Sequence, residues 1–193
     1  FIIEKKIISH GKKIPQPYNI NDSDHLSNLI YVQGNFENYN YFKNLREDLI
    51  QIFKPLDIFI KRQDDLINKL INTNSVSIHI RQNRFSDQKN LKTNINKLHK
   101  SNEFSNEVIT YIKNAEQFFR KKLTNPVFFI WSNDFTGLDK HFSKEKYNFI
   151  TDNDLINDFN LFSYAKHFIV SPSTFHWWGA YLNENPDKIC IRP

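Results

Sequence analysis

Hydroxyl side chains gather in one turn late in the chain, between two apolar segments. Within residues 166–182, a short apolar run at 168–170 leads into the turn 171–174, and two adjacent tryptophans follow. Ser173 or Thr174 can act as the N-cap of a helix whose first N–H groups have no intrahelical partner. A strand, a hydroxyl turn and a helix N-terminus predict an anion site suited to a phosphate or diphosphate. The alternative is a capped helix with aromatic core anchors.

A second group of chemically capable side chains ends another predicted strand. Residues 75–81 alternate between polar and apolar side chains, the pattern of a strand with two unlike faces. His79 and Arg81 lie on its polar face, and Arg84 follows shortly after. Because open parallel sheets bind ligands outside the carboxyl ends of their strands, these side chains are placed for binding. The alternative is a half-exposed strand end with solvated arginines.

Asn133 and Asp134 follow a third predicted strand. Residues 127–131 are continuously apolar, as parallel strands buried on both faces are. An Asp at the end of such a strand can accept a hydrogen bond from a ribose hydroxyl or a guanine edge. The alternative is a turn or a helix cap.

The elements that must position these residues alternate along the chain. Strands are predicted at 75–81, 127–131, 147–151, 168–170 and 188–192. Helices are predicted at 105–123, 139–142, 154–164 and after residue 173, while the polar residues 88–103 predict a mobile or loosely helical segment. This order predicts an α/β fold with a doubly wound, Rossmann-like parallel sheet.

The first part of the chain has weaker patterns. It predicts a strand pair, or the end of one, within residues 1–9, and a loop at 11–28. A short strand that runs into a turn is predicted at 31–36, and helices at 41–53 and 64–71. The chain starts at Phe1 and contains no Met, so we expect it to be the C-terminal part of a longer protein.

Composition narrows the class of protein. The 193 residues suit one domain, or one large domain with a piece of another, and no apolar run approaches the ~20 residues of a membrane span. The single cysteine excludes a disulfide framework and a cysteine-based metal cluster. With four glycines, the chain also lacks the glycine-rich phosphate loops of dinucleotide-binding and P-loop proteins.

The protein is modestly basic, with a net charge of +5 and a pI of about 9.1. This excess favours an anionic partner such as a nucleotide or a phospholipid surface. Because the sequence has no aromatic-interleaved basic motif, we expect no nucleic-acid partner.

Taken together, the motifs resemble glycosyltransferase family 11, the α-1,2-fucosyltransferases of bacterial surface glycans and animal blood-group sugars. Residues 31–36 are similar to its Tyr-x-Gln-Gly-Tyr-Phe block, 76–81 to His-x-Arg-Arg-Gly-Asp, and 128–134 to Phe-x-Phe-Ser-Asp-Asp. Residues 158–167 and 173–182 resemble Asp-x-x-Leu-Met-Ser-x-Cys-Lys-His and Ser-Ser-Phe-Ser-Trp-Trp-Gly-Ala-Trp-Leu. The resemblance covers about residues 30–193.

The resemblance implies the donor-binding, C-terminal half of a GT-B-type enzyme. Residues 75–193 would form the GDP-sugar-binding domain, and residues 1–74 would bridge to an acceptor-side half. The implied reaction is the inverting transfer of L-fucose from GDP-fucose to a galactoside hydroxyl in surface glycan synthesis, with no metal or other cofactor. The implied partners are GDP-fucose, a galactose-terminated glycan, the missing N-terminal half and a peripheral membrane contact, and the implied location is cytoplasmic.

The resemblance also assigns roles to the residues. Arg81 and His79 would be the catalytic residues. Arg81 would bind the β-phosphate bidentately, and His79 would shape the site or contact the donor, with general base as a weaker alternative. The remaining donor contacts would be Arg84, Asn133, Asp134, Ser173, Thr174 and Phe175. Trp177 and Trp178 would pack behind the turn rather than stack on sugar.

One departure from the family pattern leaves an alternative open. Gln82, Asn83 and Arg84 stand where the family has Arg, Gly and Asp. Arg84 supplies a displaced positive charge, but the acidic residue is lost. The alternative is therefore a relative or fragment that binds a GDP-sugar without transferring it.

Overall fold

The computed structural model describes residues 2–6, 29–33, 40, 42–54, 64–85, 95–151 and 154–193. The chain divides into two compact units, residues 1–53 and 54–193. The first contains two parallel strands, β1 (Ile2–Lys6) and β2 (Leu29–Gln33), then a 3-10 helix, η3 (Lys43–Leu45), and α1 (Arg46–Ile52). The loop predicted at 11–28 lies outside the described residues. Of the described helices, none is long and apolar enough to cross a membrane.

The second unit is built on one parallel sheet. Its strands are β3 (Asn74–Ile80), β4 (Pro126–Ser132), β5 (Tyr147–Phe149), β6 (His167–Ile169) and β7 (Cys190–Ile191). They lie in the order β5-β4-β3-β6-β7, and every neighbouring pair runs parallel. The predicted α/β class and the parallel sheet are therefore confirmed.

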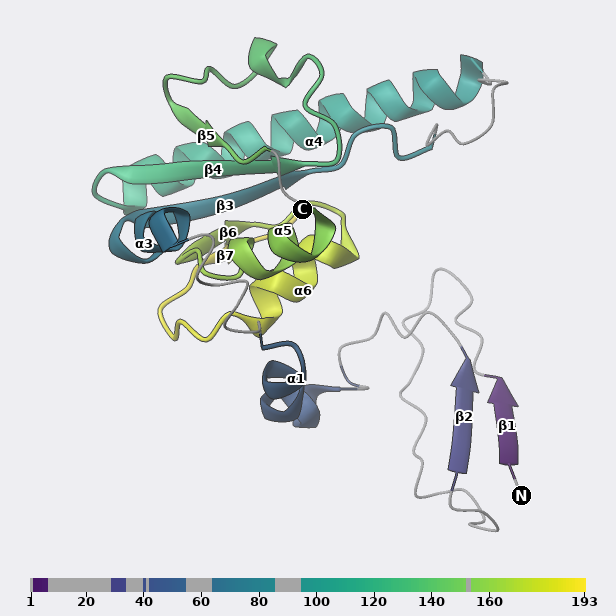
Figure 1. Cartoon of the computed structure of the whole chain (residues 1–193). Coiled ribbons are helices and arrows are strands. Elements are labelled where there is room, and N and C mark those ends of the chain that lie inside the picture. Colours follow the sequence, from purple (N-terminus) through teal and green to yellow (C-terminus); the bar gives the residue numbers. More distant parts are fainter. Residues whose placement is uncertain are drawn as a thin grey trace. The chain divides into compact units, whose positions relative to one another are not determined.

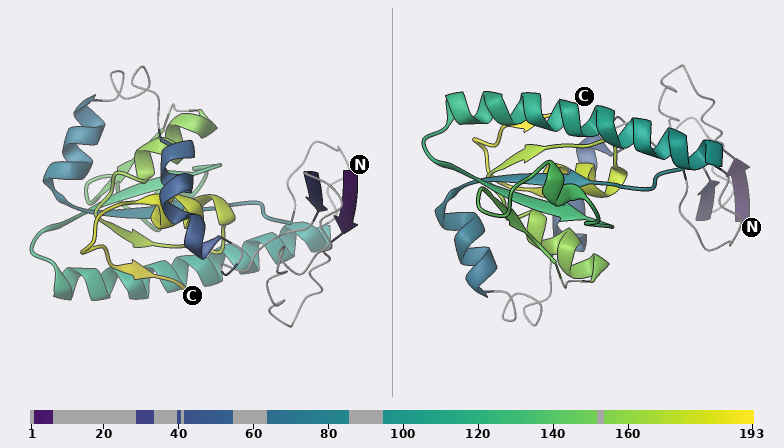
Figure 2. Two further views of the ribbon diagram at one scale, coloured as in Figure 1. Left: turned by 90° about the horizontal axis from the view of Figure 1, so that it is seen from below. Right: turned by 90° about the horizontal axis from the view of Figure 1, so that it is seen from above.

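Helices cover both faces of this sheet, as Figures 1 and 2 show. They are α3 (Asp64–Asn72), α4 (Ile95–Lys122), α5 (Leu155–Phe162) and α6 (Thr174–Leu182), with a short 3-10 helix, η4 (Leu138–Lys140), after β4. The helix α4 packs on one face, where Leu138 of η4 joins its core cluster, and α3, α5 and α6 pack on the other. Helices on both faces of a parallel sheet define the doubly wound arrangement that the sequence predicts.

Strand β3 shows how alternation divides the core. Val76, Ile78 and Ile80 belong to the apolar cluster under α4. The intervening Ser77 and His79 face the opposite side, where His79 lies beside aromatic rings of α5 and α6. The polar face of β3 is therefore buried under helices rather than exposed, because the second helical layer covers it.

The long helix α4 corrects one prediction. A loosely helical or mobile segment was expected over residues 88–103, but α4 already begins at Ile95 and runs without a break to Lys122. Ile95–Lys100 are exposed, and the first turns of α4 extend past the carboxyl ends of the strands (Figure 1). Because these turns bury little surface, their sequence lacks the apolar periodicity that identifies an amphipathic helix.

Candidate active site

The chain reverses direction in the sheet between β3 and β6. From β3 it moves outward through β4 to β5, then returns to place β6 on the other side of β3. The crossovers that leave β3 and β6 therefore separate, and the carboxyl ends of these two strands are the place where parallel sheets of this kind bind ligands. Residues 79–81 end or follow β3, and residues 171–174 follow β6. The structure thus brings together the two segments that the sequence singles out.

His79 lies almost buried at this switch point. The residue is only 8% exposed. The centroid of its ring lies 5.7 Å from that of Phe175 and 5.6 Å from that of His176. Burial, and to a smaller extent the Arg81 charge, lowers the pKa of His79 to about 4. The imidazole is therefore neutral near pH 7. Among the described residues, its Nδ1 atom has no hydrogen-bond partner.

Two further buried polar residues belong to this part of the structure, of which His176 was missed by sequence reasoning and Ser171 lies in the predicted hydroxyl turn. His176 is fully buried in α6, with its Nε2 atom 3.3 Å from the Ser77 hydroxyl, and Ser171 is 4% exposed. Nδ1 of His176 and Oγ of Ser171 also have no partner within the described ranges. Because buried polar atoms are nearly always satisfied, these unsatisfied atoms are candidate contacts for a water or a ligand. The position of Ser77 on the polar face of β3 was the available signal.

The N-terminus of α6 keeps its N–H groups free of a side-chain cap. Ser173 occupies the N-cap position in extended backbone, but its side chain makes no capping hydrogen bond, contrary to the predicted cap. Thr174 is exposed. The helix therefore presents uncapped N–H groups and the positive end of its dipole to the switch point.

Phe175 has a different position from its two polar neighbours in the turn. Its ring packs against Phe162 and Phe159 of α5, with centroids 5.2 and 5.3 Å away, as well as against His79. Its side chain thus anchors the first turn of α6 to α5, while its backbone belongs to the N-terminal turn.

The two tryptophans of α6 are half-buried. Trp177 stacks on Tyr181 at 4.9 Å, and Trp178 packs edge-on against Trp177. The residues of α6 that enter the core are His176, Gly179 and Ala180. The tryptophans thus form an aromatic group along α6, and the side chain buried beneath the turn is the imidazole of His176.

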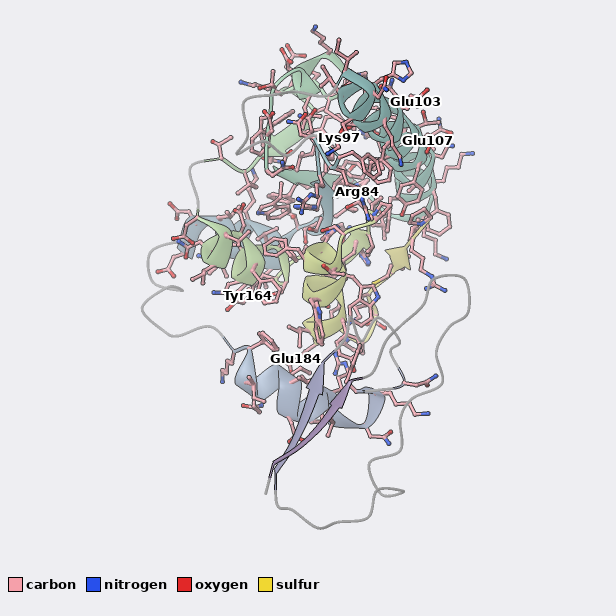
Figure 3. The ribbon with its side chains drawn as sticks, turned by 90° about the vertical axis from the view of Figure 1, so that its right-hand side faces the viewer. Arg84, Lys97, Glu103, Glu107, Tyr164 and Glu184 are labelled. Carbon is pink, nitrogen blue, oxygen red and sulfur yellow. The ribbon has the colours of Figure 1, made fainter. Side chains whose placement is uncertain are left out.

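Arg81 and Arg84 are both exposed after the end of β3. The Arg84 guanidinium donates from Nη1 to the carbonyl oxygen of Pro172, in the turn between β6 and α6. It also lies over the ring of Phe104 in α4, 4.9 Å from the centroid. Figure 3 shows Arg84 between α4 and α6.

Asn133 and Asp134 join the ends of β4 and β3. Asn133 accepts from the N–H of Gln82 at 2.8 Å and donates to its carbonyl oxygen at 3.2 Å. The Asp134 carboxylate accepts from the Thr136 N–H at 2.9 Å and from the Asn83 amide at 3.0 Å. The bonds from Thr136, followed by that from Asn83, lower the pKa of Asp134. Their contact with guanosine stays a prediction, and their observed bonds hold the loop after β3.

The backbone conformation of Asn83 accounts for one departure from the family pattern. Its φ is 57°, in the left-handed region that favours glycine and, among other residues, asparagine. The resembled family has Gly at this position, so the substitution keeps a backbone conformation that few other side chains tolerate.

A separate pocket of about 660 Å³ lies at the β5 edge of the sheet. Its polar lining includes Lys69 of α3 and Asn148 of β5, which hydrogen-bond to each other. It contains none of the predicted site residues, so the switch point is the better candidate for chemistry.

Comparison with known proteins identifies the family. The family model "Glycosyl transferase family 11" matches residues 26–192. An α-1,2-colitosyltransferase of Escherichia coli is 32% identical over 165 residues, which cover 83% of this chain and 53% of that protein. The O-antigen biosynthesis glycosyltransferase WbnK of Escherichia coli is 26% identical over 153 residues, which cover 77% of this chain and 46% of that protein. This chain thus spans about half the length of these curated relatives. It belongs to glycosyl transferase family 11.

Proposed function

We propose that the chain is the donor-binding part of an inverting glycosyltransferase. The reaction moves L-fucose from GDP-fucose to a galactoside hydroxyl, with an α-1,2 linkage, during synthesis of a surface polysaccharide. The observation that carries this proposal is the switch point, where Arg81 and the uncapped N-terminus of α6 flank a neutral imidazole. The family membership and the names of the two relatives support the transferase class, the linkage and the O-antigen setting.

The chemistry of the donor fits these groups. Cleavage of the bond between fucose and phosphate leaves negative charge on GDP, and positive groups must stabilise that charge in the transition state. Arg81 is an always-charged fork that can bind a phosphate bidentately, and the N–H groups of α6 add the positive end of a helix dipole. Together they would bind the β-phosphate as its charge develops.

His79 contributes through its neutral form. With a pKa of about 4, its imidazole is a weak base at neutral pH. A general base works best when its pKa is near the working pH, which favours donor contact over proton abstraction for this residue. The base that deprotonates the acceptor hydroxyl would then lie elsewhere in the complete protein.

Calorimetry with GDP tests the site, and product analysis tests the reaction. We expect the full-length protein to bind GDP and to release it from GDP-fucose only when a β-galactoside acceptor is present. The name of the E. coli relative makes colitose the second candidate sugar, so GDP-colitose is assayed in parallel. Preferential turnover of GDP-colitose would move the donor assignment to that sugar. Failure to bind GDP would reject the donor-site proposal itself.

An inactive GDP-sugar-binding relative is the second candidate function. The observation that favours it is the replacement of the family's Arg-Gly-Asp by Gln82, Asn83 and Arg84. Tight GDP binding without transfer to any galactoside, in the full-length protein, would establish this alternative.

The setting of the reaction follows from the same proposal. A galactose-terminated glycan is the acceptor, and the net charge of +5 favours peripheral contact with an anionic membrane on the cytoplasmic side. Sedimentation with vesicles that contain anionic lipid, compared with neutral vesicles, measures that contact. Equal sedimentation with both would argue against it.

A further inference from the structure

The Arg84 side chain connects two elements that are far apart in sequence. Its guanidinium lies over the Phe104 ring of α4 and donates to the Pro172 carbonyl. Within the described part of the chain, neither of these two contacts is with a carboxylate. A planar guanidinium can stack on a ring and donate in its own plane at the same time, so both contacts hold together.

The loop that carries Arg84 is itself fixed on the α4 side. The N–H of Phe85 donates to the buried hydroxyl of Ser101 at 3.0 Å, and the Phe85 ring packs edge-on against Phe104 at 5.7 Å. On the other side, the reciprocal bonds between Gln82 and Asn133 tie the loop to β4. The backbone at Arg84 is therefore already held in place. The hydrogen bond from Arg84 to Pro172 consequently restrains the turn at residues 171–174, and not the loop that carries Arg84.

The restrained turn is the one that leads into α6. The N–H of Ser173 donates to the Ser171 carbonyl at 2.7 Å, and the N–H of Trp177 donates to the Ser173 carbonyl at 3.0 Å. Pro172 lies between Ser171 and Ser173 in the chain, so its position sets the direction of the uncapped N–H groups that follow. With Ser173 making no side-chain cap, the bond from Arg84 is a tertiary restraint on this N-terminus.

We propose that Phe104 is a positioning residue for the donor diphosphate, acting through Arg84 on the turn before α6. This inference rests on the proposed function, because it assigns a role within the same site. It places a determinant of donor binding on α4, outside the family motifs. Phe104 supports the guanidinium, the guanidinium holds Pro172, and Pro172 fixes the N–H groups that receive the phosphate. Preorganised donors of this kind bind without a cost of ordering the turn.

Hydrogen exchange in the ligand-free, full-length protein tests the restraint without reference to activity. We expect both Arg84→Ala and Phe104→Leu to speed amide exchange in residues 173–176, by about three- to tenfold for an exposed cation–π contact and hydrogen bond. Arg120→Ala is the control for a contact elsewhere on α4, since Arg120 lies over the Phe128 ring at 4.7 Å and also pairs with Glu116 near the other end of the helix. Unchanged exchange at 173–176 in both site variants would overturn the proposal.

GDP affinity then separates positioning from direct contact. If Phe104 positions the site, Phe104→Leu weakens GDP binding about three- to tenfold, and Phe104→Tyr, which keeps a ring, restores it. The donor KM should rise while kcat changes little. Weaker binding in Arg84→Ala with parental binding in Phe104→Leu would show that Arg84 touches the phosphate directly, and would reject the role of Phe104. Absence of GDP binding by the parent protein would instead reject the proposed function, while the exchange result would still stand.

Discussion

At the scale of single residues, the two imidazoles beneath the turn define the electrostatics of the site. His79 and His176 have ring centroids 5.6 Å apart, and burial lowers the pKa of both, to about 4 for His79 and well below the ordinary value for His176. A proton on either ring would place charge in a region packed with Phe162 and Phe175. The folded state therefore requires both rings to stay neutral.

The free energy of unfolding should consequently fall as the pH is lowered. In the unfolded chain His79 gains a proton below its ordinary pKa of about 6.5, whereas the folded state resists protonation until about 4. Because the unfolded state then binds more protons, the free energy of unfolding should drop by about 3 kcal/mol from pH 7 to pH 4 through His79 alone. Urea unfolding across that range measures it, with His79→Asn expected to give a flatter dependence.

The control for this experiment is His99→Asn, because the side chain of His99 is 73% exposed. That variant should follow the parent at every pH, since carboxylates titrate equally in both. A parallel fall in stability for parent and His79→Asn would show that the imidazole is not responsible.

Arg81 offers a second prediction at this scale. Arg81→Ala should weaken GDP binding about 10- to 100-fold, the value of a charge-assisted hydrogen bond, and Arg81→Lys should lie between, because it keeps the charge but loses the fork. Calorimetry measures the three dissociation constants. Lys122→Ala, at the exposed end of α4, is the control. Equal affinity of Arg81→Ala and parent would remove Arg81 from the phosphate.

Individual residues of the site also differ in how far they can be predicted from the sequence. His79 and Arg81 were found because strand alternation and position at a carboxyl end are readable from local sequence. His176 was not found, because its burial depends on α6 packing across β3, and the neighbouring tryptophans dominate the pattern. The hydrogen bonds that Asn133 makes to Gln82 depend on strands β3 and β4 being neighbours, which the sequence does not state.

At the scale of elements, the close contact between α5 and α6 can be tested with a single substitution. An ideal Cβ on Gly179 would lie 1.7 Å from Cε2 of Phe162. The two helices approach this closely because Gly179 has no side chain. This contact also fixes the position of α6, whose first turn carries the proposed phosphate site.

Gly179→Ala should therefore destabilise the protein by about 1–3 kcal/mol through overpacking, although alanine favours a helix by about 1 kcal/mol. Denaturant unfolding gives the value. Adding Phe162→Leu should recover part of the loss, since the shorter side chain vacates the contact. Stability equal to or above that of the parent in Gly179→Ala would contradict the packing.

Element boundaries were predicted well where the element is buried in the core. The buried strands β3 and β4 differ by one residue from their predicted limits, whereas α4 begins at Ile95 rather than at residue 105. The first turns of α4 lie beyond the sheet, so propensity and the anchoring Ser101 form the helix without an apolar face. A pattern search for burial cannot detect such an extension.

At the scale of the whole molecule, the helix α3 decides where the sheet domain begins. The compact unit that holds the sheet comprises residues 54–193 and includes α3, while a GDP-sugar-binding domain at residues 75–193 stays a prediction. Ile67 and Leu70 enter the core with Phe129 and Phe168, and the Ser75 hydroxyl donates to the Leu70 carbonyl at 2.6 Å. The sequence shows α3 as an amphipathic helix but not which sheet it covers.

Residues 54–193 should thus fold as a separate fragment, and residues 75–193 should not. Loss of α3 uncovers Phe129 and Phe168, and a buried aromatic side chain contributes roughly 1.5–3 kcal/mol. Circular dichroism and thermal unfolding of both fragments, with and without GDP, check this. A cooperative transition for 75–193 equal to that of 54–193 would show that α3 is dispensable.

The central position of β3 has a consequence for how the protein is made. β3 pairs with β6, and the Ser75 hydroxyl accepts from the N–H of Lys166, which lies 91 positions later in the chain. Contacts between such distant residues form slowly, because closure of the long loop precedes any gain. We expect pulse-labelled refolding to protect the amides of β6 after those of β4, and equal protection times would oppose this. The proposed donor site would then form only after β6 leaves the ribosome, so an earlier nascent chain would not bind the nucleotide.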